Sequence, residues 1–128
     1  MTRFLVPAAL LVAAIIHLVP VIGVLGVAQL QSLYGIDAST PDLAILMRHR
    51  AVLFGLLGAF LVTAAFRKSL QPLAFVAAFA SVVSFIALAW ATGGYGPEVA
   101  RVVKADLGVL AVLAVGALAL AVQRRGKA

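Results

Sequence analysis

The chain has 128 residues, of which 65% are hydrophobic and 11% are charged, and its mean hydropathy is +1.19. Soluble domains carry about 25% charged residues, so this composition excludes an ordinary soluble protein and predicts a domain covered by lipid. The absence of cysteine excludes disulfides, thiolate chemistry and cysteine-ligated metals. The net charge of +6 does not indicate nucleic-acid binding, because the basic residues are spread over the predicted helix ends instead of gathering on one face.

The first predicted span covers about residues 4–29 of a single domain predicted over residues 1–128. Its basic start at Arg3, followed by an apolar run, is similar to a signal peptide. The run is much longer than the apolar region of a signal peptide and no clear cleavage site follows, so we interpret it as an uncleaved helix. Pro20 removes one backbone hydrogen bond within this helix and is expected to kink it.

The second predicted span begins with three helix signals. Thr40 is suited to cap the helix, Pro41 to occupy its first position, and Asp42 to complement its positive end. The third span begins near Pro72 and ends at a turn rich in glycine. The second, third and fourth spans are predicted to cover about residues 41–66, 72–92 and 98–123.

Three segments of the chain are basic and contain no acid: the N-terminus, the turn at 67–71 and the C-terminus. Cytoplasmic segments of membrane proteins carry an excess of Lys and Arg. Four spans place these three segments on one side of the membrane, so both termini are predicted to be cytoplasmic. The predicted fold class is therefore all-α: a polytopic membrane protein with a bundle of four transmembrane helices.

Two charged residues are predicted to lie within the apolar layer at the same depth. Arg50 is 17 residues from Arg67, and Asp106 is 17 residues from Gln123. Arg67 and Gln123 mark the inner edge of the apolar layer. With a rise of ~1.5 Å per residue, Arg50 and Asp106 both lie about 25 Å above that edge, inside a layer of ~30 Å. An ion pair between the second and fourth spans is therefore feasible, and an unpaired charge there would cost at least a few kcal/mol.

Two arginines, Arg48 and Arg50, are candidates for the pair with Asp106. Arg48 shares its helix face with small residues that favour close packing of helices, namely Ala51, Gly55 and Ala59. Arg50 shares its face with larger residues that can meet lipid, namely Phe54, Leu57 and Leu61. Depth favours Arg50, whereas the helix face favours Arg48.

Charged residues near the outer ends of the second and fourth helices suggest two interpretations. In the first, they only hold these helices together and anchor them at the outer interface. In the second, they line an outward-facing pocket that favours an anionic headgroup or carboxylate. The residues assigned to this pocket are Arg48 or Arg50, His49, Arg101, Lys104 and Asp106.

His17 lies near the middle of the first span, where a histidine is a functional candidate by default. The simpler interpretation is a neutral imidazole that hydrogen-bonds Ser81 or Ser84 on the third span. Two histidines without cysteine or HxxxH spacing predict no metal site, and no other cofactor is expected. Three aromatic residues near the outer boundary are interpreted first as an interfacial belt and second as pocket walls: Tyr34, Trp90 and Tyr95.

Two stretches of the sequence resemble a known group of proteins. They are Leu33-Tyr34-Gly35 and the segment Leu46-Met47-Arg48-His49-Arg50-Ala51-Val52-Leu53-Phe54-Gly55, which is followed by a short basic turn and two more spans. This arrangement is similar to small uncharacterised bacterial four-helix membrane proteins, broadly DoxX-like. The resemblance implies a multi-pass protein of the bacterial inner membrane with a single four-helix bundle. It implies no reaction and no catalytic residue.

The function predicted from the sequence is a non-enzymatic membrane module. It would bind a lipid or a lipophilic anionic ligand through the outward-facing pocket, or assist a membrane partner. One alternative is a small dimeric transporter, although the first helix carries His17 in place of an acid. Another is a membrane enzyme that uses His49 and Asp106 as an acid–base pair. The expected partners are membrane lipids, a small lipophilic or anionic molecule and a second copy of the chain.

Overall fold

The computed structural model describes residues 2–127, so Met1 and Ala128, the two ends of the predicted domain, lie outside the described residues. Its elements are helical, in the order α1 (Thr2–Leu18), η1 (Val19–Leu25), α2 (Val27–Tyr34), α3 (Pro41–Phe66), α4 (Gln71–Thr92) and α5 (Pro97–Arg125), where η1 is a 3₁₀ helix. Four segments are long and apolar enough to cross a membrane: α1 continued by η1, then α3, α4 and α5. The all-α architecture with four candidate membrane-spanning segments is confirmed.

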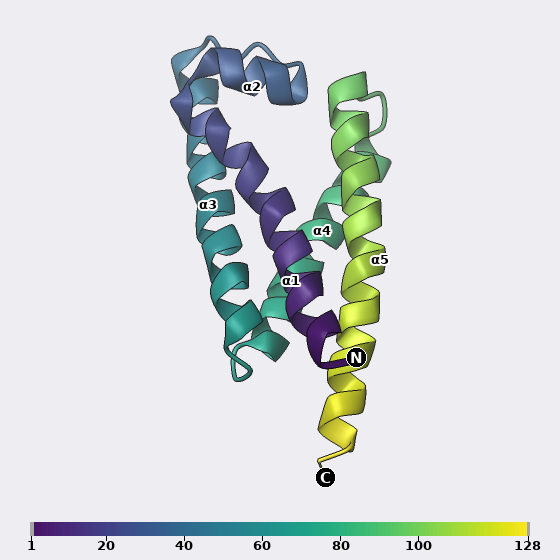
Figure 1. Cartoon of the computed structure of the whole chain (residues 1–128). Helices are drawn as coiled ribbons and strands as arrows, with labels where there is room; N and C mark the ends of the chain where they lie inside the picture. Colours follow the sequence, from purple (N-terminus) through teal and green to yellow (C-terminus); the bar gives the residue numbers. More distant parts are fainter. Residues whose placement is uncertain (1, 128) are drawn as a thin grey trace.

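The two ends of the helical bundle differ (Figure 1). One end carries the N- and C-termini and the turn between α3 and α4. The other end carries α2, which lies across the long helices, and the turn before α5. The three basic, acid-free segments therefore gather at one end, as four alternating spans require.

The first span is shorter than predicted, and α2 was not predicted. The α-helix stops at Leu18, and the chain continues as a 3₁₀ helix with Pro20 in its first turn, because proline lacks the N–H needed for an α-helical bond. Gly26 then adopts φ 153°, a conformation that residues with a side chain rarely take, and α2 begins at Val27. The predicted span 4–29 thus ends inside α2, and the segment between the first two predicted spans is helical as far as Tyr34.

Helix α1 is the centre of the core and packs against both α3 and α5. Two glycines permit the closest approaches. A Cβ atom on Gly58 of α3 would lie 2.6 Å from Leu18 Cδ2, and one on Gly116 of α5 would lie 2.5 Å from the Cβ of Ala9. Small residues therefore set the distances between helices, as expected where lipid removes the hydrophobic drive for association.

The packed face predicted for α3 was wrong. Ala51 is buried, but Gly55 is only half-buried and Ala59 is exposed. A step of four residues turns about 40° past a full turn, so residue 59 lies roughly 80° away from residue 51, whereas a step of seven residues falls short of two turns by only about 20°. The face that packs accordingly repeats every seven residues, through Ala51, Gly58 and Ala65.

The starts of the later helices agree with their sequence signals except at one cap. Pro41, Pro72 and Pro97 each lie in the first two positions of their helices. Thr40 is the N-cap residue of α3, but its side chain makes no capping hydrogen bond. Thr40 therefore occupies the expected N-cap position, but its side chain does not cap the helix.

Candidate functional site

A small, largely enclosed polar cavity lies beneath α2, where α1, α3, α4 and α5 meet. Its volume is about 40 Å³. One water needs roughly 10–15 Å³ measured in this way, so the cavity has room for about three waters but not for a lipid headgroup. Ten residues line it: Ile16, His17, Pro20, Tyr34, Arg50, Phe54, Ser81, Phe85, Val102 and Asp106.

His17 forms one wall of the cavity and has both ring nitrogens paired. Its Nδ1 lies 2.7 Å from the carbonyl oxygen of Ala13, and its Nε2 lies 2.8 Å from Ser81 Oγ. Because a carbonyl only accepts, Nδ1 carries the proton, and in a neutral imidazole Nε2 accepts from the serine hydroxyl. The hydrogen bond predicted between His17 and the third span is confirmed with Ser81, whereas the hydroxyl of Ser84 donates to the carbonyl of Ser81.

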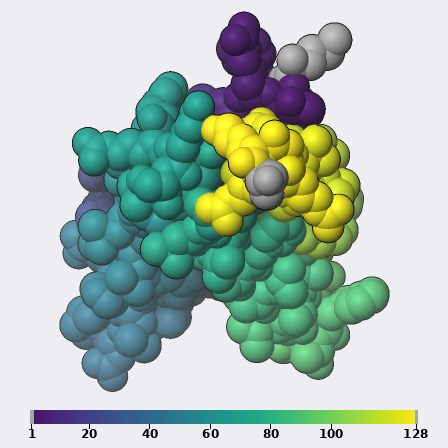
Figure 2. All heavy atoms as spheres, turned by 90° about the horizontal axis from the view of Figure 1, so that it is seen from below, coloured from purple at the N-terminus to yellow at the C-terminus, as the bar shows by residue number. Residues whose placement is uncertain are grey.

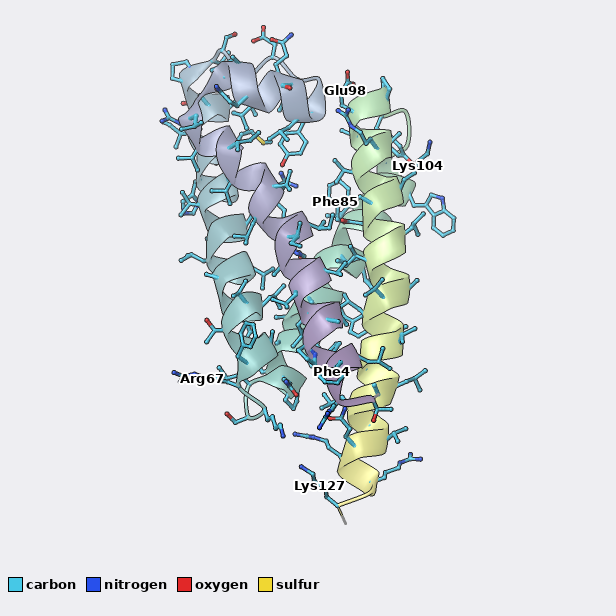
Figure 3. The ribbon with its side chains drawn as sticks, in the orientation of Figure 1. Phe4, Arg67, Phe85, Glu98, Lys104 and Lys127 are labelled. Atoms are coloured by element: carbon cyan, nitrogen blue, oxygen red, sulfur yellow. The ribbon has the colours of Figure 1, made fainter. Side chains whose placement is uncertain are left out.

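Arg50 enters the cavity from α3 and is surrounded by aromatic rings. Its Nη1 donates to Tyr34 Oη at 2.8 Å. Its Cζ lies 4.5 Å from the ring centroid of Phe54, 5.0 Å from that of Tyr34 and 6.0 Å from that of Phe85. Figure 3 labels Phe85 in the half of the bundle nearer α2. Cation–π contacts and a hydrogen bond therefore hold the guanidinium in one place.

Asp106 lines the same cavity from α5, and its side chain is buried at 7% exposure. The arginine that shares the cavity with it is Arg50. Arg48 is exposed, and its Nε donates to the carbonyl oxygen of Val24 in η1 at 2.8 Å. Depth therefore identified the arginine that shares the cavity with Asp106, but no ion pair joins the two side chains in the part of the chain that the structure describes. The argument from helix face failed because the Arg50 face is directed inward, where Leu61 is fully buried.

Several residues assigned to the outward-facing pocket lie outside this cavity. His49 is exposed on α3, so it does not line the cavity with Asp106, and the proposed acid–base pair is not assembled there. Lys104 is exposed on α5 and projects away from the bundle in Figure 3. Trp90 is 85% exposed, consistent with its interpretation as a belt residue.

Tyr34 is a pocket wall, as its second interpretation predicted, and its first interpretation was wrong. It was assigned first to an interfacial belt, but it is 8% exposed and its hydroxyl accepts a hydrogen bond from Arg50. Gly26 and Gly35 bracket the eight residues of α2, and both have positive φ angles. Two glycine stops separated by two helical turns were the signal that the chain folds back and returns Tyr34 to the bundle.

Two grooves adjoin the cavity on either side of α5. The α2–α5 groove has a volume of about 370 Å³ and is lined by Ile16, Val19, Pro20, Ser32, Leu33, Tyr34, Arg101, Val102 and Ala105. The α4–α5 groove has a volume of about 360 Å³ and is lined by Arg50, Phe85, Leu88, Ala89, Thr92, Tyr95 and Val99. The single pocket expected from the sequence is therefore divided, with Arg101 and Tyr95 in different grooves.

Comparisons of the chain with protein-family models, with curated proteins and with solved structures found no match.

Proposed function

We propose that the chain is a multi-pass protein of the bacterial cytoplasmic (inner) membrane, with both termini in the cytoplasm, and that it is related to the DoxX-like group. Four long apolar segments support membrane insertion. The orientation is supported by the end that carries both termini, because its charges are all basic and cytoplasmic segments are enriched in Lys and Arg.

The protein binds an anionic amphiphile in the α2–α5 groove. The observation that carries this proposal is that a groove of about 370 Å³, lined mainly by apolar residues, contains one charged side chain, the exposed Arg101. Ligand sites in proteins have volumes of about 300–1,000 Å³, with a few polar groups that orient the ligand. The apolar walls accept a hydrocarbon chain, and Arg101 accepts a carboxylate or a phosphate.

The polar cavity supports this groove rather than binding the ligand itself. Its volume of about 40 Å³ is too small for a lipid headgroup or a carboxylate-bearing chain. Tyr34 belongs both to the cavity and to the groove, and its hydroxyl is fixed by Arg50. The cavity therefore holds one wall of the groove in position.

Replacement of Arg101 tests this function. The protein is purified in mild detergent, and the small molecules that co-purify with it are identified by unbiased mass spectrometry. Loss of a charge-assisted hydrogen bond weakens binding roughly ten-fold or more, so Arg101→Gln should lose most of an anionic amphiphile that the unchanged protein retains.

Lys104→Gln is the matched control, because it removes the same charge from the same helix at an exposed position that does not line the groove. It should retain the ligand. If both variants lost the ligand equally, or if the unchanged protein retained none, the groove would not be a binding site for an anion.

A further inference from the structure

The opposite end of the bundle contains a separate basic depression. It has a volume of about 320 Å³ and lies between the turn before α4 and the last turns of α5. Figure 2 views this end, where the C-terminal segment (yellow) lies beside the segment that enters α4 (teal). Its lining consists of three cations, three other polar residues and one apolar residue, namely Lys68, Arg124, Lys127, Ser69, Gln71, Gln123 and Leu120.

The walls of this depression are fixed by hydrogen bonds to neighbouring helices. Gln123 Nε2 donates to the carbonyl oxygen of Thr2 at 2.7 Å, which joins the end of α5 to the start of α1. Gln71 is buried, and its Nε2 donates to the carbonyl oxygen of Ala65 at 3.4 Å, which joins α4 to the end of α3. The basic side chains therefore project from a framework held by four helix ends.

Among the described residues 2–127, no acidic side chain belongs to this end of the protein. The four acids are Asp37, Asp42, Glu98 and Asp106, which belong to the half of the protein that contains α2 and the start of α5. Three cations that converge on one hollow repel one another, and an anion with several oxygens relieves this repulsion. Orientation in the membrane requires basic residues at this end, but it does not require them to converge.

We propose that this depression binds the phosphate group of an anionic phospholipid from the leaflet at this end of the protein. The proposal relies on membrane insertion but not on ligand binding in the α2–α5 groove. Lys68, Arg124 and Lys127 supply positive charge, and the hydroxyl of Ser69 supplies a neutral donor. Leu120 is an apolar wall that suits the glycerol backbone and the first methylene groups, which favours a lipid over free phosphate.

The chain itself offers a pair of matched variants. Lys68 and Arg124 line the depression, whereas their immediate neighbours Arg67 and Arg125 do not. K68Q/R124Q and R67Q/R125Q therefore remove the same charge from the same end. The full-length proteins are placed in phosphatidylcholine nanodiscs with and without phosphatidylglycerol, and native mass spectrometry measures the phosphatidylglycerol that each retains.

We expect K68Q/R124Q to retain phosphatidylglycerol at least ten-fold more weakly, since both lining residues lose a charge-assisted hydrogen bond to the phosphate. R67Q/R125Q should bind as the unchanged protein does. Equal loss in the two variants would show a general surface-charge effect and would overturn the proposal. Lys127 lies beyond α5 and is exposed, so Lys127→Gln does not put folding at risk. This variant should weaken retention several-fold, because it loses one charge-assisted contact to the phosphate.

Two further measurements separate this site from its alternatives. Inorganic phosphate is added as a competitor, and displacement of the lipid by phosphate at an equal concentration would identify free phosphate as the ligand and overturn the lipid assignment. Arg101→Gln, in the α2–α5 groove, is measured beside K68Q/R124Q to tell the two sites apart. Loss of the lipid in Arg101→Gln but not in K68Q/R124Q would place it in the groove and overturn the proposal.

Discussion

Asp106 and Arg50 show how a charge is accommodated inside an apolar bundle. Both line a cavity with room for about three waters, and the guanidinium also has an aromatic surround and the hydroxyl of Tyr34. The two side chains form no ion pair among the described residues, but they face one cavity, so removing one charge leaves the other without the opposite charge in that cavity. Asp106→Asn should therefore lower the free energy of unfolding by about 2–3 kcal/mol, measured by thermal melting in detergent.

Glu98, the other acid of α5, provides the comparison. It is half-buried, and its carboxylate lies against Gly35, where an added Cβ would be 2.5 Å from Oε2. Figure 3 shows it at the start of α5, close to the end of α2. It does not line the cavity, so Glu98→Gln should change stability by less than about 1 kcal/mol. Equal effects of the two replacements would contradict the assigned role of Asp106.

At the scale of the elements, the contact of α1 with α5 depends on Gly116. An added Cβ there would lie 2.5 Å from the Cβ of Ala9 and 2.9 Å from Cζ of Phe75, so the helices would have to separate. Overpacking of this kind costs about 1–3 kcal/mol, and Gly116→Ala should lower the melting temperature in detergent accordingly.

Gly108 is the control on the same helix, because nothing lies within 4 Å of an added Cβ at that position. Alanine is favoured over glycine in a helix by about 0.5–1 kcal/mol, so Gly108→Ala should be neutral or stabilising. A similar loss of stability in both variants would show that helix flexibility, rather than close packing, explains Gly116.

At the scale of the whole molecule, the predicted orientation can be tested with introduced cysteines, because the sequence contains none. Ser39, before α3, and Ser69, before α4, are both exposed and lie at opposite ends of α3. In intact bacterial cells, a membrane-impermeant maleimide should label Ser39→Cys. It should label Ser69→Cys only after the cells are permeabilised, because the acid-free basic end is predicted to be cytoplasmic. The reverse pattern would invert the proposed topology.

The sequence by itself determined the features that depend on composition and on distance along a helix. Apolar runs separated by proline and glycine signals located the four candidate spans, and residue counts placed Arg50 and Asp106 at the same depth. These inferences succeed because the rise per residue of a helix is nearly constant.

Only the tertiary structure decided how each helix is rotated and where the chain folds back. In a membrane protein, both the lipid-facing and the packed sides of a helix are apolar, so periodicity does not distinguish them, and the packed face of α3 was misplaced for this reason. The hydrogen bond from Arg50 to Tyr34 joins α2 to α3, and the sequence did not predict this contact. The division of the expected pocket into a cavity and two grooves likewise follows from contacts between helices that are distant in sequence.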